Sequence, residues 1–504
     1  MIEASAFTAA DVRDAADLKR LLRRRGCGDD IIVVSNRAPW MHRYSGDGIV
    51  GERPAGGLVT ALEAVLAAQG GCWIAHGSGQ ADRATCDGNG HVLAHWLPGS
   101  YRLRRLWLSE AEVGAYYDGM ANEALWPLCH SAGVAPVFRD ADWACYRHVN
   151  GRFADAVVAE ARSERPVVFV QDYHLALVPQ MVRARLPDAI IVAFWHIPFP
   201  SPRTLARFPW HAQLMQGLAH STVVGVQTPD DAARFAAARA ACAPAADATA
   251  MVRACPVSIA WPAQAAAAGS GDGQRLRRRF GVPPDTRLLL GVDRMDYTKG
   301  IPERLRAFAL LLERDPAQRG RVTLLQIAAP GRMALAAYRR LAREVHDLAA
   351  AINARFGSAD YTPVLLHAGA VDAATVAACY RACDVCLVTS LQDGMNLVAK
   401  EFVAARADLR GALVLSRFAG AAGELAQALT IDPRDVAALA RSIAMALAMP
   451  AHEQARRMAA MRAVVREHTV FRWAAQLLED GMAAAARGPR PVAAPAAAPC
   501  LVPA

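Results

Sequence analysis

The stretch LLLGVDRMDYTKGIPERLRAF, residues 288–308, has the pattern that decides the fold. Its first five residues form a short apolar run, which is typical of a strand that is buried on both faces. Pro302 stands where a helix begins, just after Gly300, and Leu305 and Phe308 then recur at helical spacing. A strand, a loop and an amphipathic helix in this order form the repeating unit of parallel α/β sheets.

The same unit recurs along the chain. Short apolar or β-branched runs alternate with helical patterns, which predicts parallel sheets covered by helices on both faces. The other runs are at residues 31–35, 167–171, 190–194, 223–227, 322–327, 385–389 and 412–416. Residues 262–273 (PAQAAAAGSGDG) have the composition of a linker and divide these runs into two groups. We therefore predict an α/β protein with two doubly wound, Rossmann-like domains that face each other across a cleft.

The length of 504 residues is what two domains of ordinary size require. The predicted parts are an N-terminal extension (1–30), a first domain (31–262), a second domain (274–470), a C-terminal helix that packs back on the first domain (471–486) and a disordered tail rich in Pro and Ala (487–504).

Composition narrows the class of protein. The chain has 11 scattered cysteines, with one C-x-x-C (Cys383 and Cys386) and so no paired C-x-x-C framework, and it lacks an apolar run long enough to cross a membrane. We therefore expect a cytoplasmic protein with free thiols and no membrane partner. The net charge of +9 comes from arginines spread along the whole chain. Phosphorylated small molecules explain this charge as well as nucleic acid does, and we expect no nucleic-acid partner. A homo-oligomer, dimer or tetramer, is compatible with the sequence.

Lysine is scarce in this chain, since only three of the 56 basic residues are lysines. Lys299 lies in the loop of the opening stretch together with Arg294, after a strand and beside a helix N-terminus. Open α/β sheets bind ligands at such places, and an ammonium group meets a phosphate oxygen as a point charge. Arg294 and Lys299 therefore predict a site for a diphosphate.

A second motif, SLQDGMNLVAKE at residues 390–401, follows another predicted strand. Asp393 lies at the end of that strand, and Asn396 is suited to cap the next helix, whose free N–H groups favour an anion. Glu401 lies one turn into that helix, where its carboxylate is suited to accept hydrogen bonds from the two hydroxyls of a ribose. Lys400 projects about 100° away from Glu401 and is expected to be a second contact or a structural salt bridge.

Together, DRMDYTKG (293–300) and DGMNLVAKE (393–401) resemble the trehalose-6-phosphate synthase family, which are retaining glycosyltransferases of the GT-B fold. The resemblance implies that the second domain binds UDP-glucose, with Arg294 and Lys299 on the diphosphate and Glu401 on the ribose. It further implies that the uracil is met near Val371. The residues implied to hold the donor glucose and phosphate are Asp393, Gly394, Met395, Asn396, Leu397 and Val398.

The first half has the acceptor motifs that this resemblance implies. IIVVSNR (31–37) is a predicted strand that ends at Arg37, whose bidentate donors suit a sugar phosphate. The residues from there to Gly56 and Gly57, in ERPAGGL, are expected to form a mobile loop. By resemblance, Arg37 binds glucose 6-phosphate and the glycine pair approaches the donor.

Other segments of the first half complete the implied site. YYDGMANEALW (116–126), GGCWIAHGSG, QDYHLALVP and FWHIPFPSP match family segments, the last of which places His196 on the donor sugar. The residues implied to bind the acceptor are Arg37, Trp73, Tyr117, Trp126, Asp172, Tyr173, Gln227 and Arg332. Departures from the family pattern at Gln171, Val226 and Ala260 lie near the acceptor side or the junction between the domains.

The reaction that the resemblance implies is transfer of glucose from UDP-glucose to glucose 6-phosphate with retention, which gives α,α-trehalose 6-phosphate and UDP. Arg294, Lys299, His196 and Asp393 are the implied catalytic residues, with no enzymatic nucleophile, no metal and no cofactor beyond the donor. The alternatives are a sister activity, such as a glucosylglycerol-phosphate synthase or a pseudo-glycosyltransferase, and a catalytically silent regulatory relative. The nucleotide of the donor, UDP against ADP or GDP, is not fixed by sequence.

Overall fold

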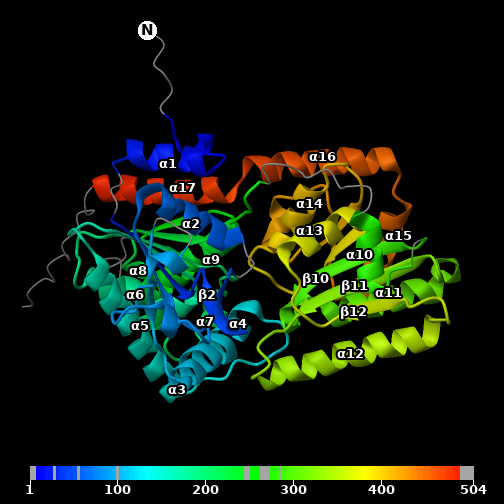
Figure 1. The fold of residues 1–504 in the computed structure, drawn as a ribbon, viewed down its shortest axis with the longest axis horizontal. Coiled ribbons are helices and arrows are strands. Elements are labelled where there is room, and N and C mark those ends of the chain that lie inside the picture. Colours follow the sequence, from blue (N-terminus) through cyan, green and yellow to red (C-terminus); the bar gives the residue numbers. More distant parts are fainter. Residues whose placement is uncertain are drawn as a thin grey trace, which may run out of the picture.

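Two parallel β-sheets organise the chain, as predicted (Figure 1). The computed structural model describes residues 7–26, 30–53, 57–97, 101–242, 250–261, 272–283 and 285–487. The predicted linker at 262–273 and the tail at 487–504 therefore lie almost wholly outside the described residues, as does Gly56. In this article the first domain is the part built on the N-terminal sheet, and the second domain is the part built on the other.

The sheet of the first domain has seven strands in the order β5-β4-β1-β6-β7-β8-β9, all parallel. Its strands are β1 (Ile31–Arg37), β4 (Cys72–His76), β5 (Arg102–Leu106), β6 (Val167–Gln171), β7 (Ile190–Phe194), β8 (Val223–Val226) and β9 (Met251–Ala254). The helices of this part are α1 (Ala15–Arg24), α2 (Gly57–Gln69), α3 (Glu110–Glu112), the π-helix η4 (Val113–Leu125), α4 (Trp126–His130), α5 (Asp140–Glu160), α6 (Val178–Arg183), α7 (Pro202–Leu205), α8 (His211–Ala219) and α9 (Pro229–Cys242).

The sheet of the second domain has six parallel strands in the order β12-β11-β10-β13-β14-β15. Its strands are β10 (Arg287–Arg294), β11 (Val322–Ala329), β12 (Val364–His367), β13 (Val385–Val388), β14 (Ala412–Ser416) and β15 (Leu429–Ile431). The helices here are α10 (Asp272–Phe280), α11 (Ile301–Arg314), α12 (Ala336–Phe356), α13 (Ala373–Ala382), α14 (Leu397–Ala405), α15 (Val436–Ala448), α16 (Ala451–Glu467) and α17 (Val470–Ala486), with short 3₁₀ turns η6 (Tyr297–Lys299) and η8 (Gly420–Gly423).

The stretch at residues 288–308 folds as its pattern predicts. It forms β10, the turn η6 and α11, with Pro302 in the first turn of the helix. Leu305 and Phe308 are fully buried on the inner face of α11. Because the strands of each sheet are parallel, the loops that carry the predicted site residues all leave their sheets at the carboxyl ends.

The last helix returns to the first domain. The chain leaves the second domain through α16, and α17 then packs on β7 and β8 (Figure 1). Trp473 of α17 stacks on Phe169 with 5.5 Å between ring centroids, and Asp480 forms a bidentate ion pair with Arg253 at 2.7 and 2.9 Å. The chain therefore crosses between the domains twice, once after β9 and once between α16 and α17.

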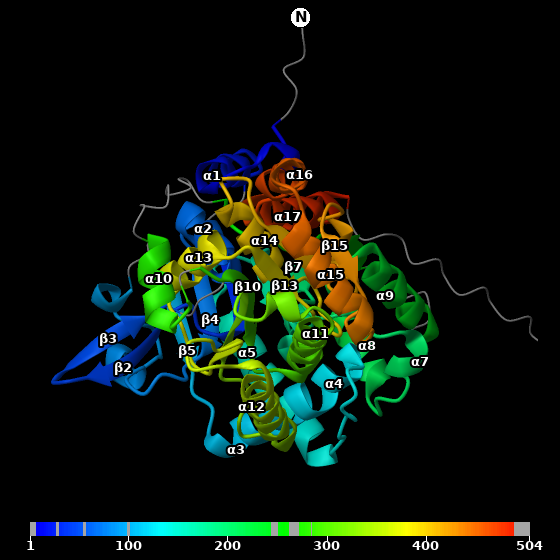
Figure 2. The same cartoon turned by 90° about the vertical axis from the view of Figure 1, so that its right-hand side faces the viewer.

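Residues 41–52, expected to belong to a mobile loop, form an antiparallel hairpin of β2 (Met41–Ser45) and β3 (Gly48–Glu52) that projects from the body in Figure 2. A fully buried polar cluster anchors it. The backbone N–H of His42 donates to Asp82 at 2.7 Å, and Arg105 pairs with the same Asp82 oxygen at 3.0 Å. These residues therefore have regular structure, with distant charged side chains bound at His42, and the mobility expected of them stays a prediction.

Candidate active site

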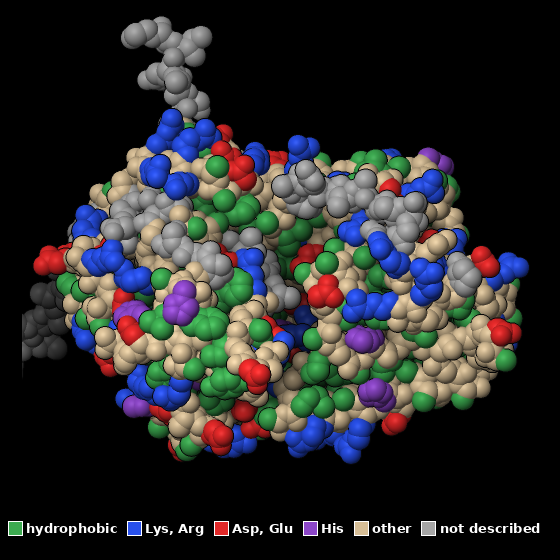
Figure 3. Space-filling model, viewed as in Figure 1, with side chains coloured by type: hydrophobic (Ala, Val, Ile, Leu, Met, Phe, Trp, Pro, Cys, Tyr) green, Lys and Arg blue, Asp and Glu red, His purple; other side chains and the backbone are tan. Residues whose placement is uncertain are grey.

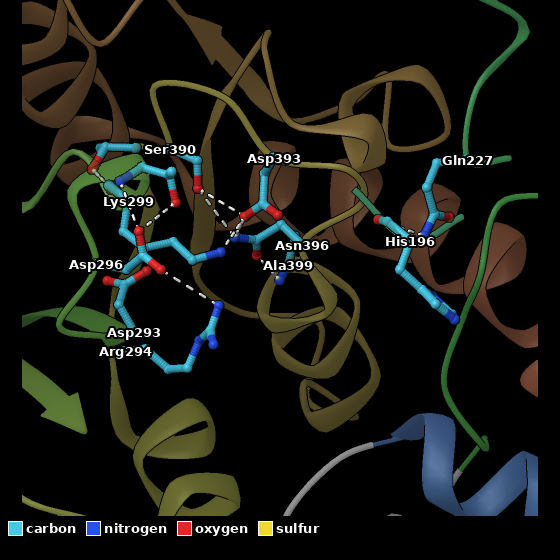
Figure 4. Close-up of polar contacts among 12 residues, drawn as sticks. His196, Gln227, Asp293, Arg294, Asp296, Lys299, Ser390, Asp393, Asn396 and Ala399 are labelled. Atoms are coloured by element: carbon cyan, nitrogen blue, oxygen red, sulfur yellow. Dashed lines mark hydrogen bonds and ion pairs between the residues drawn. The ribbon is translucent and has the colours of Figure 1, made fainter. Parts of the chain in front are cut away.

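The two motifs of the second domain meet at the carboxyl ends of β10 and β13, beside the hollow between the domains in Figure 3. Lys299 Nζ donates a hydrogen bond of 2.5 Å to Oδ2 of Asp393, and Asn396 Nδ2 donates to the same oxygen at 3.0 Å (Figure 4). Burial acts to raise the pKa of Asp393, but Lys299 and the hydrogen bonds outweigh burial and lower it. Asp393 is therefore an anion that holds the ammonium group in one place.

Two unusual backbone conformations build this arrangement. Gly300 has a φ of +63°, and a side chain there would collide with the backbone carbonyl of Thr389. Asn396 has a φ of +74°, which asparagine tolerates better than most residues, and its side chain caps α14 by accepting from the N–H of Ala399 at 3.3 Å. The N-terminus of α14, an end that favours anions, thus begins next to the Lys299–Asp393 pair.

Two arginines of the second domain reach Trp126 of the first. The guanidinium carbon of Arg294 lies 5.4 Å from the ring centroid of Trp126, and that of Arg332 lies 4.4 Å from it. Both arginines also approach Oδ2 of the buried Asp296, at 3.5 Å and 3.3 Å respectively. Two guanidinium groups share one carboxylate, so a net positive charge faces the place where the domains meet.

The predicted nucleotide residues follow the same edge of the sheet. Glu401 lies on α14, where Tyr380 donates a hydrogen bond to it at 3.0 Å. Burial raises the pKa of Glu401, and the bond from Tyr380 opposes that rise. Val371 lies in the loop between β12 and α13, at the carboxyl end of the edge strand. The turn into α14 contains Gly394, Met395 and Asn396, and Leu397 and Val398 are the first two residues of the helix.

In the first domain, Asp172 follows β6 with a φ of +72°, a conformation that is costly for a residue with a side chain. Its Oδ1 accepts hydrogen bonds from the backbone N–H groups of Tyr173 and His196, both at 3.0 Å. Burial raises the pKa of Asp172 to about 7, against the opposing effect of these bonds and of Arg332 and Arg294. Backbone strain and a shifted pKa together are typical of a functional carboxyl group.

His196 is held from several sides. Its Nε2 is hydrogen-bonded to Oε1 of Gln171 at 2.9 Å, and burial lowers its pKa to about 3, so the imidazole is neutral. Gln227 Nε2 donates to the His196 carbonyl at 3.1 Å. A side chain on Gly394 would collide with this carbonyl oxygen, so the backbones of the two domains touch here. In Figure 4 the imidazole ring points away from Asp393.

Arg37 and Tyr117, two residues of the predicted acceptor site, contact each other. Arg37 Nη2 donates to Tyr117 Oη at 3.4 Å, and the Tyr117 ring stacks on His174 with centroids 5.6 Å apart. Burial would raise the pKa of Tyr117, but Arg332 and Arg37 outweigh burial and lower it. Tyr117 projects from the π-helix η4, a rare geometry that is frequent at functional sites.

Three predicted acceptor residues are buried and make hydrogen bonds within the first domain. Trp73 lies in the core on β4, only 1% exposed, and its indole N–H donates to Ser35 Oγ at 2.8 Å. Tyr173 is also fully buried and donates its hydroxyl hydrogen to Asn122 at 3.0 Å. Gln227 uses both ends of its amide inside the protein, on His196 and on the N–H of Val257. Packing inside the domain thus occupies these three side chains, and their contact with the acceptor stays a prediction.

His130 is a buried residue near the site that the sequence interpretation missed. Its ring packs against Trp126 in a tilted arrangement with 4.0 Å between ring centroids, and its Nδ1 is hydrogen-bonded to the Trp126 carbonyl at 2.9 Å. Burial lowers its pKa to about 4. The spacing of four residues from Trp126 puts both rings on one helix face, and this was the signal in the sequence. Gly57, by contrast, stands at the first position of α2.

In the described ranges, no group of three or more His, Cys, Asp or Glu side chains is arranged to hold a metal ion. None of the described helices is long and apolar enough to cross a membrane. The nine described cysteines are free thiols.

Known proteins with similar sequence and structure match nearly the whole chain. The family model for glycosyltransferase family 20 matches residues 29–482. The trehalose-6-phosphate synthase of Mycobacterium bovis is 37% identical over 484 residues, which cover 91% of this chain and 96% of that protein.

Solved structures agree with this assignment. A structure from E. coli with bound UDP-2-fluoro glucose has a TM-score of 0.79 at 30% identity and covers 90% of this chain and 98% of that one. An α,α-trehalose-phosphate synthase (UDP-forming) from Burkholderia xenovorans, in complex with glucose-6-phosphate, has a TM-score of 0.77 at 32% identity and covers 90% and 99%. The fold is therefore GT-B, with two Rossmann-like domains, and the chain belongs to glycosyltransferase family 20.

Proposed function

We propose that this protein transfers glucose from UDP-glucose to glucose 6-phosphate with retention of configuration, and so makes α,α-trehalose 6-phosphate and UDP. The observation that carries the proposal is the meeting of the donor and acceptor half-sites at Trp126, which Arg294 of the donor loop and Arg332 both contact. The E. coli neighbour binds a UDP-glucose analogue and the B. xenovorans neighbour binds glucose-6-phosphate, which supports the same pair of substrates here.

On the donor side, Arg294 and Lys299 bind the diphosphate and Glu401 binds the ribose hydroxyls. The carboxylate of Asp393 fixes Lys299 and orients the glucose, and the uracil lies near Val371. The other donor residues are Gly56, Gly57, Gly394, Met395, Asn396, Leu397 and Val398. Support comes from the placement of the second-domain residues at the carboxyl ends of the strands of their sheet and from the 2.5 Å contact between Lys299 and Asp393. UDP rather than ADP or GDP is part of this proposal.

On the acceptor side, Arg37 and Arg332 bind the phosphate of glucose 6-phosphate. Tyr117 and Trp126 bound the sugar, and the carboxyl group of Asp172 binds one of its hydroxyls. The clustering of Arg37, Tyr117 and Arg332 supports this role, because both guanidinium groups act on the pKa of the Tyr117 hydroxyl. Arginine forks are well suited to a phosphate monoester.

The reaction needs stabilisation of negative charge on the leaving UDP. Arg294, Lys299 and the N-terminus of α14 are aimed at that charge before the bond breaks, which is the form of help that usually contributes most. The carbonyl of His196 lies against Gly394, so this part of the first domain borders the donor glucose. We nominate no nucleophile of the enzyme, and the departing phosphate oxygen takes the proton of the acceptor hydroxyl.

The division of labour between the domains is part of the proposal. Residues 31–262 provide most of the acceptor site and residues 274–470 most of the donor site, with Arg332 and the pair Gly56 and Gly57 as the exceptions. Residues 471–486 attach the end of the chain to the first domain. We also propose that the protein works in the cytoplasm, which the nine free thiols support, and that it needs neither a metal nor a further cofactor. Small-molecule substrates are its proposed partners.

The test is release of UDP from UDP-glucose, measured with and without glucose 6-phosphate. The proposal predicts release that depends on the acceptor. Glucosylglycerol-phosphate synthase activity would instead require glycerol 3-phosphate, and a silent relative would release no UDP with either acceptor. Parallel reactions with ADP-glucose and GDP-glucose establish the nucleotide.

A further inference from the structure

Lys400 lies inside the protein and contacts the first domain. Its side chain is 1% exposed, and Nζ donates a hydrogen bond of 2.9 Å to the carbonyl oxygen of Val257. Val257 lies just after β9, on the first chain segment that crosses between the domains. Lys400 belongs to α14 of the second domain, so this single hydrogen bond joins the donor helix to the crossing segment.

The partner of Lys400 contacts the second crossing. Nζ of Lys400 lies 2.5 Å from Oε2 of Glu424, whose other oxygen is 3.1 Å from Nδ1 of His468. His468 stands between α16 and α17, where the chain returns to the first domain. The two crossing segments are themselves joined, because the N–H of Val470 donates to the carbonyl of Ile259 at 3.0 Å. The Lys400–Glu424 pair therefore contacts both connections between the domains.

The pair is also fixed to the donor motif. Glu424 directly follows the turn η8, and the N–H of Ala421 in that turn donates to the carbonyl of Met395 at 2.8 Å. A side chain on Gly420 would collide with the carbonyl of Gly394, so η8 and the motif are in close contact. Lys400 itself lies one turn after Asn396, the residue that caps α14.

The other end of the connection reaches His196. The N–H of Val257 donates to Oε1 of Gln227 at 3.0 Å, and Nε2 of the same amide donates to the carbonyl of His196 at 3.1 Å. This carbonyl lies against Gly394 across the domain boundary. Three hydrogen bonds thus connect Lys400 through Val257 and Gln227 to the His196 carbonyl. The backbone of α14 and the close contact between that carbonyl and Gly394 close the circuit at the donor motif.

From this circuit we propose that Lys400 and Glu424 are positioning residues that fix the spacing between the donor motif at 393–396 and the His196 carbonyl of the opposite domain. The inference rests on the proposed transferase function. Neither residue touches substrate. They set the distance across the cleft over which the sugar is transferred, and a displacement of about 1 Å there is enough to cost a large part of the rate.

Stability alone does not explain such a pair. Burial lowers the pKa of Lys400, and Glu424 opposes that change without fully restoring it. Replacement of both members of a buried ion pair by apolar side chains of similar size often leaves protein stability unchanged or increases it. Loss of one member leaves a buried charge without a partner and lowers stability. The double replacement therefore separates positioning from stability.

The experiment compares the wild-type protein with the double variant Lys400→Met/Glu424→Met and with Lys400→Arg, which keeps a cation for Glu424 and Val257. Thermal midpoint, UDP affinity by calorimetry and kcat of acceptor-dependent UDP release are measured for each. We expect the double variant to keep the thermal midpoint of the wild type and a UDP affinity within about threefold of it. Its kcat should fall at least about tenfold. Lys400→Arg is expected to recover part of that loss. A folded double variant with wild-type kcat overturns the proposal.

If the double variant does not fold, His468→Gln provides the same test from the exposed side, since the His468 side chain is 44% exposed. A reduced kcat with unchanged UDP affinity supports the proposal, and an unchanged kcat overturns it.

Hydrogen exchange of residues 255–261 and 393–399 with UDP bound reports the connection without turnover. Exchange in these segments must be faster in the variant than in the wild type, even if the wild type transfers no glucose. If the variant exchanges faster than the wild type but the wild type transfers no glucose, the result contradicts the proposed function and leaves the positioning role intact.

Discussion

The ammonium group of Lys299 lies 2.5 Å from the carboxylate of Asp393, although 94 residues separate the two in sequence. The contact is possible because β10 and β13 are neighbours in the sheet and end at the same edge. It makes the loop after β10 and the turn into α14 one unit, so the cation for the diphosphate and the turn that faces the sugar are positioned together.

Replacement of Lys299 by arginine should lower kcat/KM by about 10²-fold, because the planar fork does not fit the space of an ammonium group against Asp393. Steady-state kinetics with both substrates measures this, and an unchanged thermal midpoint shows that the fold persists. Lys400→Arg should be milder, since it keeps a cation for Glu424, and Lys19→Arg, at a half-buried lysine of α1, is the control. Near-wild-type rates for both Lys299→Arg and Lys400→Arg would show that the ammonium group has no special role.

Replacement of Glu401 by glutamine should weaken UDP binding about tenfold, because an amide accepts hydrogen bonds from two hydroxyls less well than a carboxylate does. The KM for glucose 6-phosphate should not change. Since burial raises the pKa of Glu401, UDP affinity of the wild type should increase with pH as this group ionises, and the variant should lack that increase. Calorimetry over a pH series checks both, with the exposed Glu313→Gln as control. Equal affinities for wild type and Glu401→Gln would exclude Glu401 from the ribose site.

Replacement of Arg332 by alanine should raise the KM for glucose 6-phosphate by about 10²-fold and leave UDP affinity unchanged, because one bidentate contact to the phosphate is lost. Arg340→Ala, an exposed arginine of α12, is the control and should behave as wild type. Loss of UDP affinity in Arg332→Ala with an unchanged KM would place this arginine on the donor instead.

Asp172→Asn tests the buried carboxyl group through stability. The folded state raises the pKa of Asp172 from its usual 3.8 to about 7, so the unfolded chain releases this proton first. The contribution of Asp172 to stability is therefore present below about pH 4 and is lost as pH rises toward 7. Asparagine keeps the oxygen that accepts from Tyr173 and His196 and tolerates the positive φ.

Urea unfolding of both proteins at pH 4, 5, 6 and 7 measures this effect. The free energy of unfolding of Asp172→Asn, relative to the wild type, should grow steadily over that range. Parallel pH curves for the two proteins would mean that Asp172 has an ordinary pKa in the folded state.

Local sequence signals predicted much of the fold. The apolar runs at 167–171, 190–194 and 412–416 are strands with the predicted bounds, because each is buried on both faces and bounded by polar residues. The edge strands β5, β9, β12 and β15 were not predicted, because half-exposed strands lack a continuous apolar run. The hairpin at 41–52 was missed because its anchor, Asp82 with Arg105, is formed by residues that look like surface charges in the sequence.

The candidate site divides in the same way. Arg294, Lys299 and Asn396 were predictable because each stands at a strand end or helix start with a local reason for its type. Trp73, Tyr173 and Gln227 were assigned to the acceptor on resemblance alone, and the sequence did not show the long-range packing contacts that these side chains make. The contacts of Lys400 at the domain crossings could not be predicted from the sequence either, because Val257 and Glu424 approach it only in the folded protein.

The most direct test of the central claim is proton NMR of a reaction that contains the protein, UDP-glucose and glucose 6-phosphate. We predict anomeric signals of an α,α-1,1-linked disaccharide phosphate that grow in step with UDP. Formation of a β-linked product, or of UDP with no disaccharide, would contradict the account.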